Sequence, residues 1–185
     1  HYTEGMNRVA FLDSSGQEYQ YEISRCGFSV LAVARKGDLM QMARESEHTI
    51  TGLNLRHREA MGREAAERAV ALLDAQPAAG GRMHAVLDPE LAGVFAHEAI
   101  GHASEGDLVK EGSSVIRGKI GEKIGNEILT IVDDPTIPEF GFEPVDAEGV
   151  AVRRTEIIRR GVLSAYLHNR QTLAAVGDGV AGHAR

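Results

Sequence analysis

The stretch that decides how this chain is organised is Gly93–Asp107, which reads GVFAHEAIGHASEGD. It places His97, Glu98 and His102 close together, inside a run that otherwise has the apolar and small residues of a packed helix. Neutral imidazoles are common ligands of zinc, and a neighbouring glutamate can act on a water molecule that the metal activates. The stretch therefore predicts a helix that carries a candidate metal site.

The spacing of the two histidines predicts a distorted helix. The pattern H-E-x-x-x-H is one residue longer than the H-E-x-x-H of many zinc proteases. Positions four apart on an α-helix lie within about 40° of each other, whereas positions five apart diverge by about 140°. For both rings to reach one ion, we expect either a π-bulge or a bend near Ile100 and Gly101, where glycine makes bending easier. The competing interpretation is two histidines and a glutamate on the solvated edge of an ordinary helix.

Composition restricts the class of protein. The 185 residues, 43% hydrophobic and 25% charged, suit a soluble globular protein of one large or two small domains. A formal charge of −7 and the absence of Trp disfavour nucleic-acid binding, which needs a basic face or stacking aromatics. No apolar run reaches the roughly 18 residues of a membrane span. The single Cys26 cannot form an internal disulfide and fits a reducing compartment, so we expect a cytoplasmic protein.

Residues 1–78 are expected to form an antiparallel β-meander followed by a long helix. The predicted strands share alternating or apolar character and turn residues at their ends; they are Val9–Asp13, Glu18–Ser24, Gly27–Arg35 and Leu39–His48. The last of these also has the composition of a helix, but the short turn at 36–38 favours a hairpin. After the linker Gly52–Asn54, apolar residues at a 3.6-residue period predict a helix that runs to Gln76 and is ended by Pro77 and Gly80–Gly81.

Residues 79–185 are expected to hold the motif helix and further strands and hairpins, which makes the fold class α+β. Asp88 and Pro89 form a helix start, an N-cap followed by proline at the first position, and Glu105–Asp107 closes the helix. The other predicted segments follow the breakers in the sequence: a strand at Arg82–Asp88, short strands or loop over 109–126, a strand at Glu127–Asp133, a surface loop at Thr136–Gly149, a hairpin of Val150–Ile158 with Gly161–Leu167, and a helix at Asn169–Val176.

A catalytic zinc site needs three protein ligands and an open position, and the motif supplies only two. The remaining donors each have a simpler structural interpretation. They are the helix-end carboxylates Glu105 and Asp107, the strand residues His84 and His168, the core residue Cys26, and His183, whose place in a glycine-rich loop would let it approach a ligand or substrate.

Three other patterns carry less weight. Gly177–Gly182 has the letters of a dinucleotide-binding G-x-G-x-x-G but follows a helix rather than a strand. Asp133–Asp134 is best explained as the end of a strand. Asp146 and Glu148 could position a substrate, although solvated loop charges are the simpler interpretation. Ser104 and the pair Ser113–Ser114 lack the context of a nucleophile.

The residues around the motif, and not only its spacing, match a known signature. Phe95–Asp107 resembles the metalloprotease signature of the TldD subunit in the TldD/PmbA family, also called the modulator of DNA gyrase family. Further stretches agree with that family, and the similarity spans most of the chain from about Val9. These stretches are Gly118–Ile124, Val132–Thr136, Asp146–Val150, Gly161–Leu167 and Gly182–Arg185.

The resemblance implies a zinc peptidase that acts on peptides or unfolded protein segments held in extended form, often as paired TldD-like and PmbA-like subunits. By position, His97 and His102 would be zinc ligands and Glu98 the general base, which takes a proton from water and passes it to the leaving amine. The PmbA-like partner lacks H-E-x-x-x-H, so this chain falls on the catalytic side. A homo- or hetero-oligomer with such a subunit is therefore expected.

One departure from the family limits this expectation. The family's third zinc ligand is a cysteine downstream of the point where this chain ends, and Cys26 is not at that position. We therefore expect a fragment: residues 1–78 from the family's N-terminal region and 79–185 from the start of its catalytic region, with weak zinc binding and little activity alone. The first alternative is a non-catalytic peptide-binding or assembly module. The second is nucleic-acid contact, suggested by the gyrase name and disfavoured by the acidic charge.

Overall fold

The computed structural model describes residues 1–52 and 57–185. The chain divides into two compact units. The first comprises His1–Met83 with Pro138–Phe140, and the second comprises His84–Ile137 with Gly141–Arg185. Mostly antiparallel strands and separate helices make up the described residues, which confirms the predicted α+β class.

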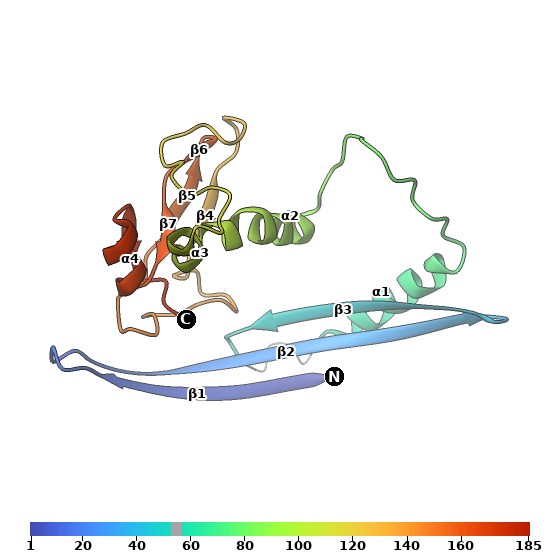
Figure 1. The fold of residues 1–185 in the computed structure, drawn as a ribbon. Coiled ribbons are helices and arrows are strands. Elements are labelled where there is room, and N and C mark those ends of the chain that lie inside the picture. The colour runs from blue at the N-terminus through green and yellow to red at the C-terminus, as the bar shows by residue number, and fades with distance from the viewer. Residues whose placement is uncertain (53–56) are drawn as a thin grey trace. The chain divides into compact units, whose positions relative to one another are not determined.

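The first unit contains the predicted β-meander. Its strands are β1 (Tyr2–Leu12), β2 (Glu18–Lys36) and β3 (Leu39–Thr49), which pair antiparallel in the order β1-β2-β3 (Figure 1). The hairpin interpretation of Leu39–His48 is confirmed, with Gly37 at a φ of 63° in the turn before it.

The prediction of two separate strands at Glu18–Ser24 and Gly27–Arg35 was wrong. They are one continuous strand of 19 residues, β2. The residues between them break the apolar alternation, yet the backbone stays in the ladder, since Cys26 pairs with Glu4 of β1 and with Thr49 of β3. Pairing on both sides therefore holds the strand extended where its side-chain pattern alone does not.

The long helix packs on this sheet. It is α1 (Glu59–Leu72), which contacts β2 and β3 and buries Ala65 and Ala69. The predicted helix continued to Gln76, past the last residue of α1. Residues 53–56, which hold part of the predicted linker and the start of the predicted helix, lie outside the described residues. Arg58 donates to both carboxylate oxygens of Glu47 in β3, at 2.6 and 2.9 Å, and so fixes the start of the helix against the sheet. Cys26 is fully buried, as expected of a core residue.

The motif region of the second unit is a chain of short helical segments. It contains α2 (Pro89–Ala96), a π-helical turn at His97–Gly101, a 3₁₀ turn at His102–Ser104 and α3 (Gly106–Glu111). The strand predicted at Arg82–Asp88 does not form, and within the described residues no strand pairs with this segment. The prediction was wrong because a strand needs a partner that the local sequence cannot reveal.

The helix α3 was not predicted, because its first residue, Gly106, lies in the Glu105–Asp107 stretch that predicts the end of the motif helix. The chain becomes extended at Glu105 and turns helical again at Gly106. Val109 then enters the core, and Gly112 ends the helix in the left-handed region at a φ of 85°. The rest of 109–126 is loop.

The strands of the second unit form two small sheets. β4 (Ile131–Asp133), β5 (Thr155–Arg159) and β6 (Val162–Leu163) are antiparallel. The predicted hairpin is confirmed for β5 and β6, but its strands are shorter than Val150–Ile158 and Gly161–Leu167, and Tyr166 and Leu167 belong to the other sheet. The Glu127–Asp133 strand is also shorter than predicted. β7 (Tyr166–His168) and β8 (Gly179–Ala181) pair in parallel across α4 (Arg170–Val176). β8 was not predicted, because its glycines read as a loop.

The core of the second unit anchors the π-helical and 3₁₀ turns of the motif segment. A cluster of buried apolar residues lies on α3, the following loop and β5–β7: Val109, Ile116, Ile157, Ile158, Leu163 and Tyr166. Ile100 and Ala103 pack against this cluster from the motif segment. The segment is thus anchored on one side by two apolar residues that lie between and just after the histidines.

Candidate metal centre

The motif helix begins where the sequence predicts. Asp88 is the N-cap, and its carboxylate accepts a hydrogen bond from the Leu91 backbone N–H at 2.8 Å. Pro89 occupies the first helical turn, where its missing N–H costs nothing. The helix leading to His97 therefore begins at a defined residue, which fixes the side of the helix on which each later residue lies.

The distortion predicted from the histidine spacing is present. The backbone N–H of His102 bonds to the carbonyl of His97, five residues back, within a π-helical turn. This wider turn brings both histidines to one side, with ring centroids 4.4 Å apart and ring planes at 72°. Gly101 keeps an ordinary helical conformation at φ −53° and ψ −60°. Of the two predicted solutions, the chain uses a π-bulge rather than a glycine bend.

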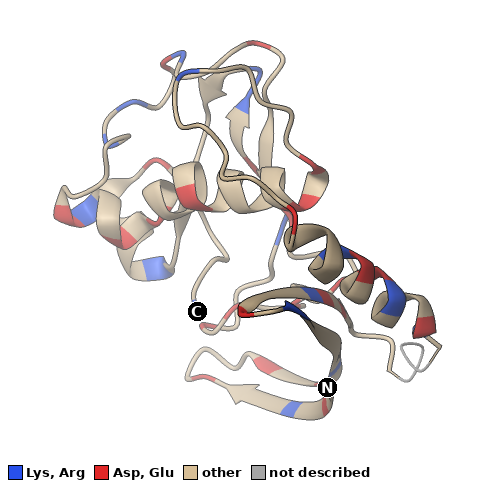
Figure 2. Cartoon of the chain, turned by 90° about the vertical axis from the view of Figure 1, so that its right-hand side faces the viewer, with Lys and Arg blue, Asp and Glu red and all other residues tan. Residues whose placement is uncertain are grey.

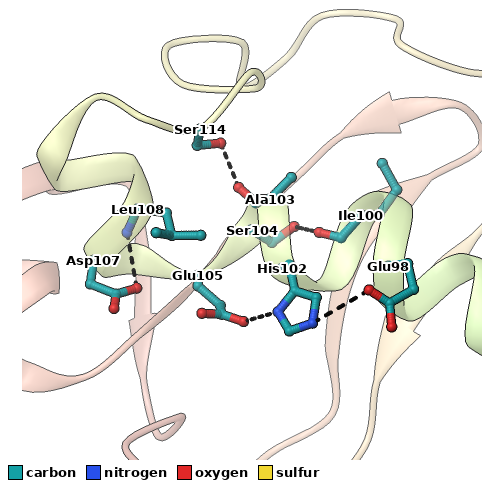
Figure 3. Close-up of polar contacts among 9 residues, drawn as sticks. All are labelled: Glu98, Ile100, His102, Ala103, Ser104, Glu105, Asp107, Leu108 and Ser114. Atoms are coloured by element: carbon teal, nitrogen blue, oxygen red, sulfur yellow. Dashed lines mark hydrogen bonds and ion pairs between the residues drawn. The ribbon is translucent and has the colours of Figure 1, made fainter.

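Three potential ligands converge on this turn. One ligand atom each from His97, Glu98 and His102 lies within 4.8 Å of the other two, and all three residues are exposed. Nε2 of His102 is 3.7 Å from a carboxylate oxygen of Glu98 (Figure 3). Two imidazoles and a carboxylate suit zinc and other divalent first-row metals, so the donor set fits a metal centre.

Two serines complete the backbone hydrogen bonding at the end of the distorted helix. Ser104 donates to the Ile100 carbonyl at 2.7 Å, and Ser114 donates to the Ala103 carbonyl at 2.6 Å (Figure 3). Carbonyls at a helix end lack partners within the helix, so these side chains stabilise its last turn. The absence of a nucleophile role for these serines stays a prediction, but both have a structural role.

Glu105 contacts His102 from the side opposite Glu98. Its carboxylate lies 2.6 Å from Nδ1 of His102. That hydrogen bond, with the negative charges of Glu105 and Glu98, raises the pKa of His102. The sequence interpretation treated Glu105 only as a weak ligand candidate. A carboxylate that accepts a hydrogen bond from the second ring nitrogen of a ligating histidine fixes the orientation of that ring, and the sequence reasoning missed this contact.

The other histidines and Cys26 are outside this group of three. His84 is exposed and lies on no strand, so its predicted position was wrong. His168 ends β7, as predicted, and is fully buried; it bonds to the Thr172 hydroxyl at 3.0 Å and the Asp178 carbonyl at 3.2 Å, and burial lowers its pKa. Cys26 belongs to the core of the first unit.

The two weak substrate-binding candidates have local partners. The His183 side chain is only 6% exposed, and its Nε2 is 3.1 Å from the Thr155 hydroxyl and 3.7 Å from an oxygen of Asp133. Glu148 accepts the backbone N–H of Arg170 at 2.8 Å, at the start of α4. Both residues therefore hold loops and helix ends in place.

Asp146 is not the solvated loop charge that its sequence context suggests. It is buried, and its carboxylate accepts three backbone N–H groups: those of Glu148 and Val150 at 2.9 Å each and that of Ala184 at 3.1 Å. The prediction was wrong because the third donor comes from far along the chain. Asp146 ties its own turn to the segment around Ala184.

Acidic and basic residues are interspersed along the described chain, as α1 illustrates (Figure 2). In the part of the chain that the structure describes, every helix is too short or too polar to span a bilayer.

Comparison with known proteins gives the family. A model of the PmbA/TldA metallopeptidase central domain matches residues 1–73, and a model of the PmbA/TldA metallopeptidase C-terminal domain matches residues 80–185. The chain belongs to the PmbA/TldD metallopeptidase family. The resemblance noted from the motif is therefore confirmed.

Curated relatives match all or nearly all of the chain but are longer. A metalloprotease of Methanothermobacter thermautotrophicus is 42% identical over 187 residues, covering 100% of this chain and 41% of that protein. A zinc metalloprotease TldD homologue of Saccharolobus solfataricus is 32% identical, covering 95% of this chain and 40% of that protein. The chain thus spans about two fifths of the length of these relatives.

Solved structures show the same fold. A protein described as a modulator of DNA gyrase from Bacteroides thetaiotaomicron superposes with a TM-score of 0.86 at 24% identity, covering 99% of this chain and 42% of that one. TldE from Thermococcus kodakarensis gives a TM-score of 0.79 at 21% identity, covering 98% and 41%. At these identities the likeness concerns the PmbA/TldD fold alone.

Proposed function

We propose that this chain carries the zinc-binding and proton-transfer residues of a peptidase that acts on peptides or unfolded protein segments. One observation carries the proposal: a π-helical turn brings His97, Glu98 and His102 together, with a ligand atom of each within 4.8 Å of the others. A plain α-helix would separate the two histidines by about 140° around its axis. The metallopeptidase family and the name of the zinc metalloprotease homologue support the choice of zinc.

In this proposal His97 and His102 bind the metal through ring nitrogens. When bound, zinc supplies Lewis-acid chemistry, polarising a carbonyl and making water more acidic. The third ligand is a cysteine outside this chain, as the family resemblance implies. The isolated 185 residues are accordingly proposed to bind zinc weakly and to turn over little substrate.

Glu98 is proposed as the general base. It follows His97 directly in sequence, and its carboxylate lies 3.7 Å from Nε2 of His102, a ring nitrogen that would hold the metal. From there it can accept a proton from water and deliver it to the departing amine nitrogen. Its exposed position leaves a peptide free to approach.

The remaining expectations from the sequence are part of the same proposal. The substrate is held in extended form, and the protein works as a homo- or hetero-oligomer with a PmbA-like subunit. The shared fold with TldE is compatible with such a pair. A cytoplasmic location is also proposed, from the cysteine content and composition.

The test uses the full-length protein and four variants. Zinc content is measured by atomic spectroscopy and peptidase activity with an unfolded protein substrate. His97→Ala and His102→Ala should lose zinc and activity. Glu98→Gln should keep zinc and lose about 10²–10⁴-fold in turnover, the contribution of a general base. The control, His84→Ala, changes an exposed histidine outside the cluster and should match the wild type in both measurements.

Two results would contradict the proposal. Peptidase activity that survives Glu98→Gln would remove the general-base role. Wild-type protein without zinc or activity, but with measurable peptide binding, would instead support the non-catalytic alternative.

A further inference from the structure

The His102 ring lies between two carboxylates that approach its two different nitrogens. Nδ1 is 2.6 Å from an oxygen of Glu105, and Nε2 faces Glu98 at 3.7 Å (Figure 3). In a neutral imidazole one nitrogen carries hydrogen and the other is the acceptor. A carboxylate at Nδ1 favours hydrogen there, because an ionised carboxylate can only accept.

Glu105 is held in place by its backbone. The residue is extended, at φ −61° and ψ 126°, between the 3₁₀ turn and α3. Its N–H donates to the His102 carbonyl at 3.2 Å, and its carbonyl accepts from the Val109 N–H at 3.1 Å. It also forms a parallel bridge with Leu167 of β7. The carboxylate therefore projects from a fixed point of the core-anchored segment.

We propose that Glu105 is a positioning residue of the metal centre: it accepts a hydrogen bond from Nδ1 of His102, fixes that tautomer and ring orientation, and leaves Nε2 as the metal-binding atom. This inference rests on the proposed function, since it concerns how His102 meets the metal. It also assigns Glu105 a role other than direct ligand, because its carboxylate binds the ring nitrogen opposite the metal-binding one. Such partners of ligating histidines typically strengthen metal binding by about 10–100-fold.

The first measurement reads the tautomer without any metal. In the metal-free full-length protein, ¹⁵N chemical shifts of the His102 ring are recorded above its pKa, so that the ring is neutral. The wild type should show the Nδ1–H tautomer. Glu105→Ala should shift the ring towards the Nε2–H form, and Glu105→Gln, which keeps an acceptor oxygen, should restore Nδ1–H in part. An unchanged tautomer in Glu105→Ala would overturn the proposal.

The second measurement is zinc affinity, by competition with a chelator. Glu105→Ala should bind zinc about 10–100-fold more weakly than the wild type, with Glu105→Gln between them. The matched control is Asp107→Asn, which changes an exposed carboxylate two residues away that accepts the Leu108 N–H instead. It should leave zinc affinity and the His102 tautomer unchanged.

The outcomes separate this inference from the proposed function. A loss of affinity in Glu105→Ala as large as that in His102→Ala would make Glu105 a ligand and overturn its positioning role. Zinc binding that is equal in Glu105→Ala and the wild type would also overturn that role. Wild-type protein that binds no zinc would overturn the proposed function, whichever tautomer His102 shows.

Discussion

Replacing Gly106 by alanine tests how the segment behind the motif is packed. A Cβ at this position would collide with Nδ1 of His168, lie 2.6 Å from the Thr172 hydroxyl, and lie 2.9 Å from the Leu167 carbonyl. Real Cβ atoms do not approach other atoms so closely, and the Leu167 carbonyl is backbone that cannot simply rotate away. Gly106→Ala must therefore displace α3 from β7 or move His168.

The cost follows from two effects. Forcing an extra methyl into a packed interior costs about 1–3 kcal/mol. Moving His168 also breaks its 3.0 Å hydrogen bond to Thr172 in a buried site, where an unpaired polar group costs about 1–3 kcal/mol. The sum of about 2–6 kcal/mol is a large part of the roughly 5–15 kcal/mol that stabilises a typical domain.

Urea unfolding, followed by circular dichroism, measures this cost as a lower midpoint at unchanged slope. The control is Gly93→Ala in α2, where a Cβ meets nothing within 4 Å. That variant should be neutral or more stable by up to about 1 kcal/mol, since alanine is the better helix former. A Gly106→Ala protein within about 0.5 kcal/mol of the wild type would refute the packing argument.

Two further predictions concern buried polar groups. Burial lowers the pKa of His168 in the folded protein. In the unfolded chain this histidine has a pKa of about 6.5, so the unfolded state binds the proton more readily. The free energy of unfolding should therefore fall by at most about 1.4 kcal/mol per pH unit as the pH drops from about 6.5 through the folded pKa. Urea midpoints across pH should show this component lost in His168→Gln but retained in His84→Ala, and an equal slope in His168→Gln would contradict it. Asp146→Ala removes the acceptor of three backbone N–H groups and should lower the free energy of unfolding by about 3 kcal/mol or more. Thermal denaturation measures this against Asp178→Ala, an exposed control, and equal melting temperatures would contradict it.

The features that could be predicted from the sequence are those with short-range causes. The start of the motif helix depends on Asp88 and on Pro89 beside it. The π-helical turn was predicted from two histidines five positions apart, on the hypothesis that both bind one ion. The α1 helix and the hairpin turn at Gly37 likewise follow from local periodicity and turn residues.

Other features depend on partners that are distant in sequence. The continuity of β2 rests on pairing at Cys26 with both neighbouring strands. The burial of Asp146 rests on a donor at Ala184, 38 residues away. No local pattern encodes such contacts, because the same polar residue is a solvated loop charge or a buried anchor according to what packs over it.

The candidate metal centre likewise has features that follow from the local sequence and features that depend on distant partners. The sequence alone determined the candidate residues, His97, Glu98 and His102, and the expectation of a widened turn, because a helix's angular spacing is set by local geometry. Only the tertiary structure decided how His102 is oriented. Glu105 reaches its ring because a bridge to Leu167, 62 residues further along, holds that residue extended beside the core. Contacts made across such a separation depend on the packing of the whole unit.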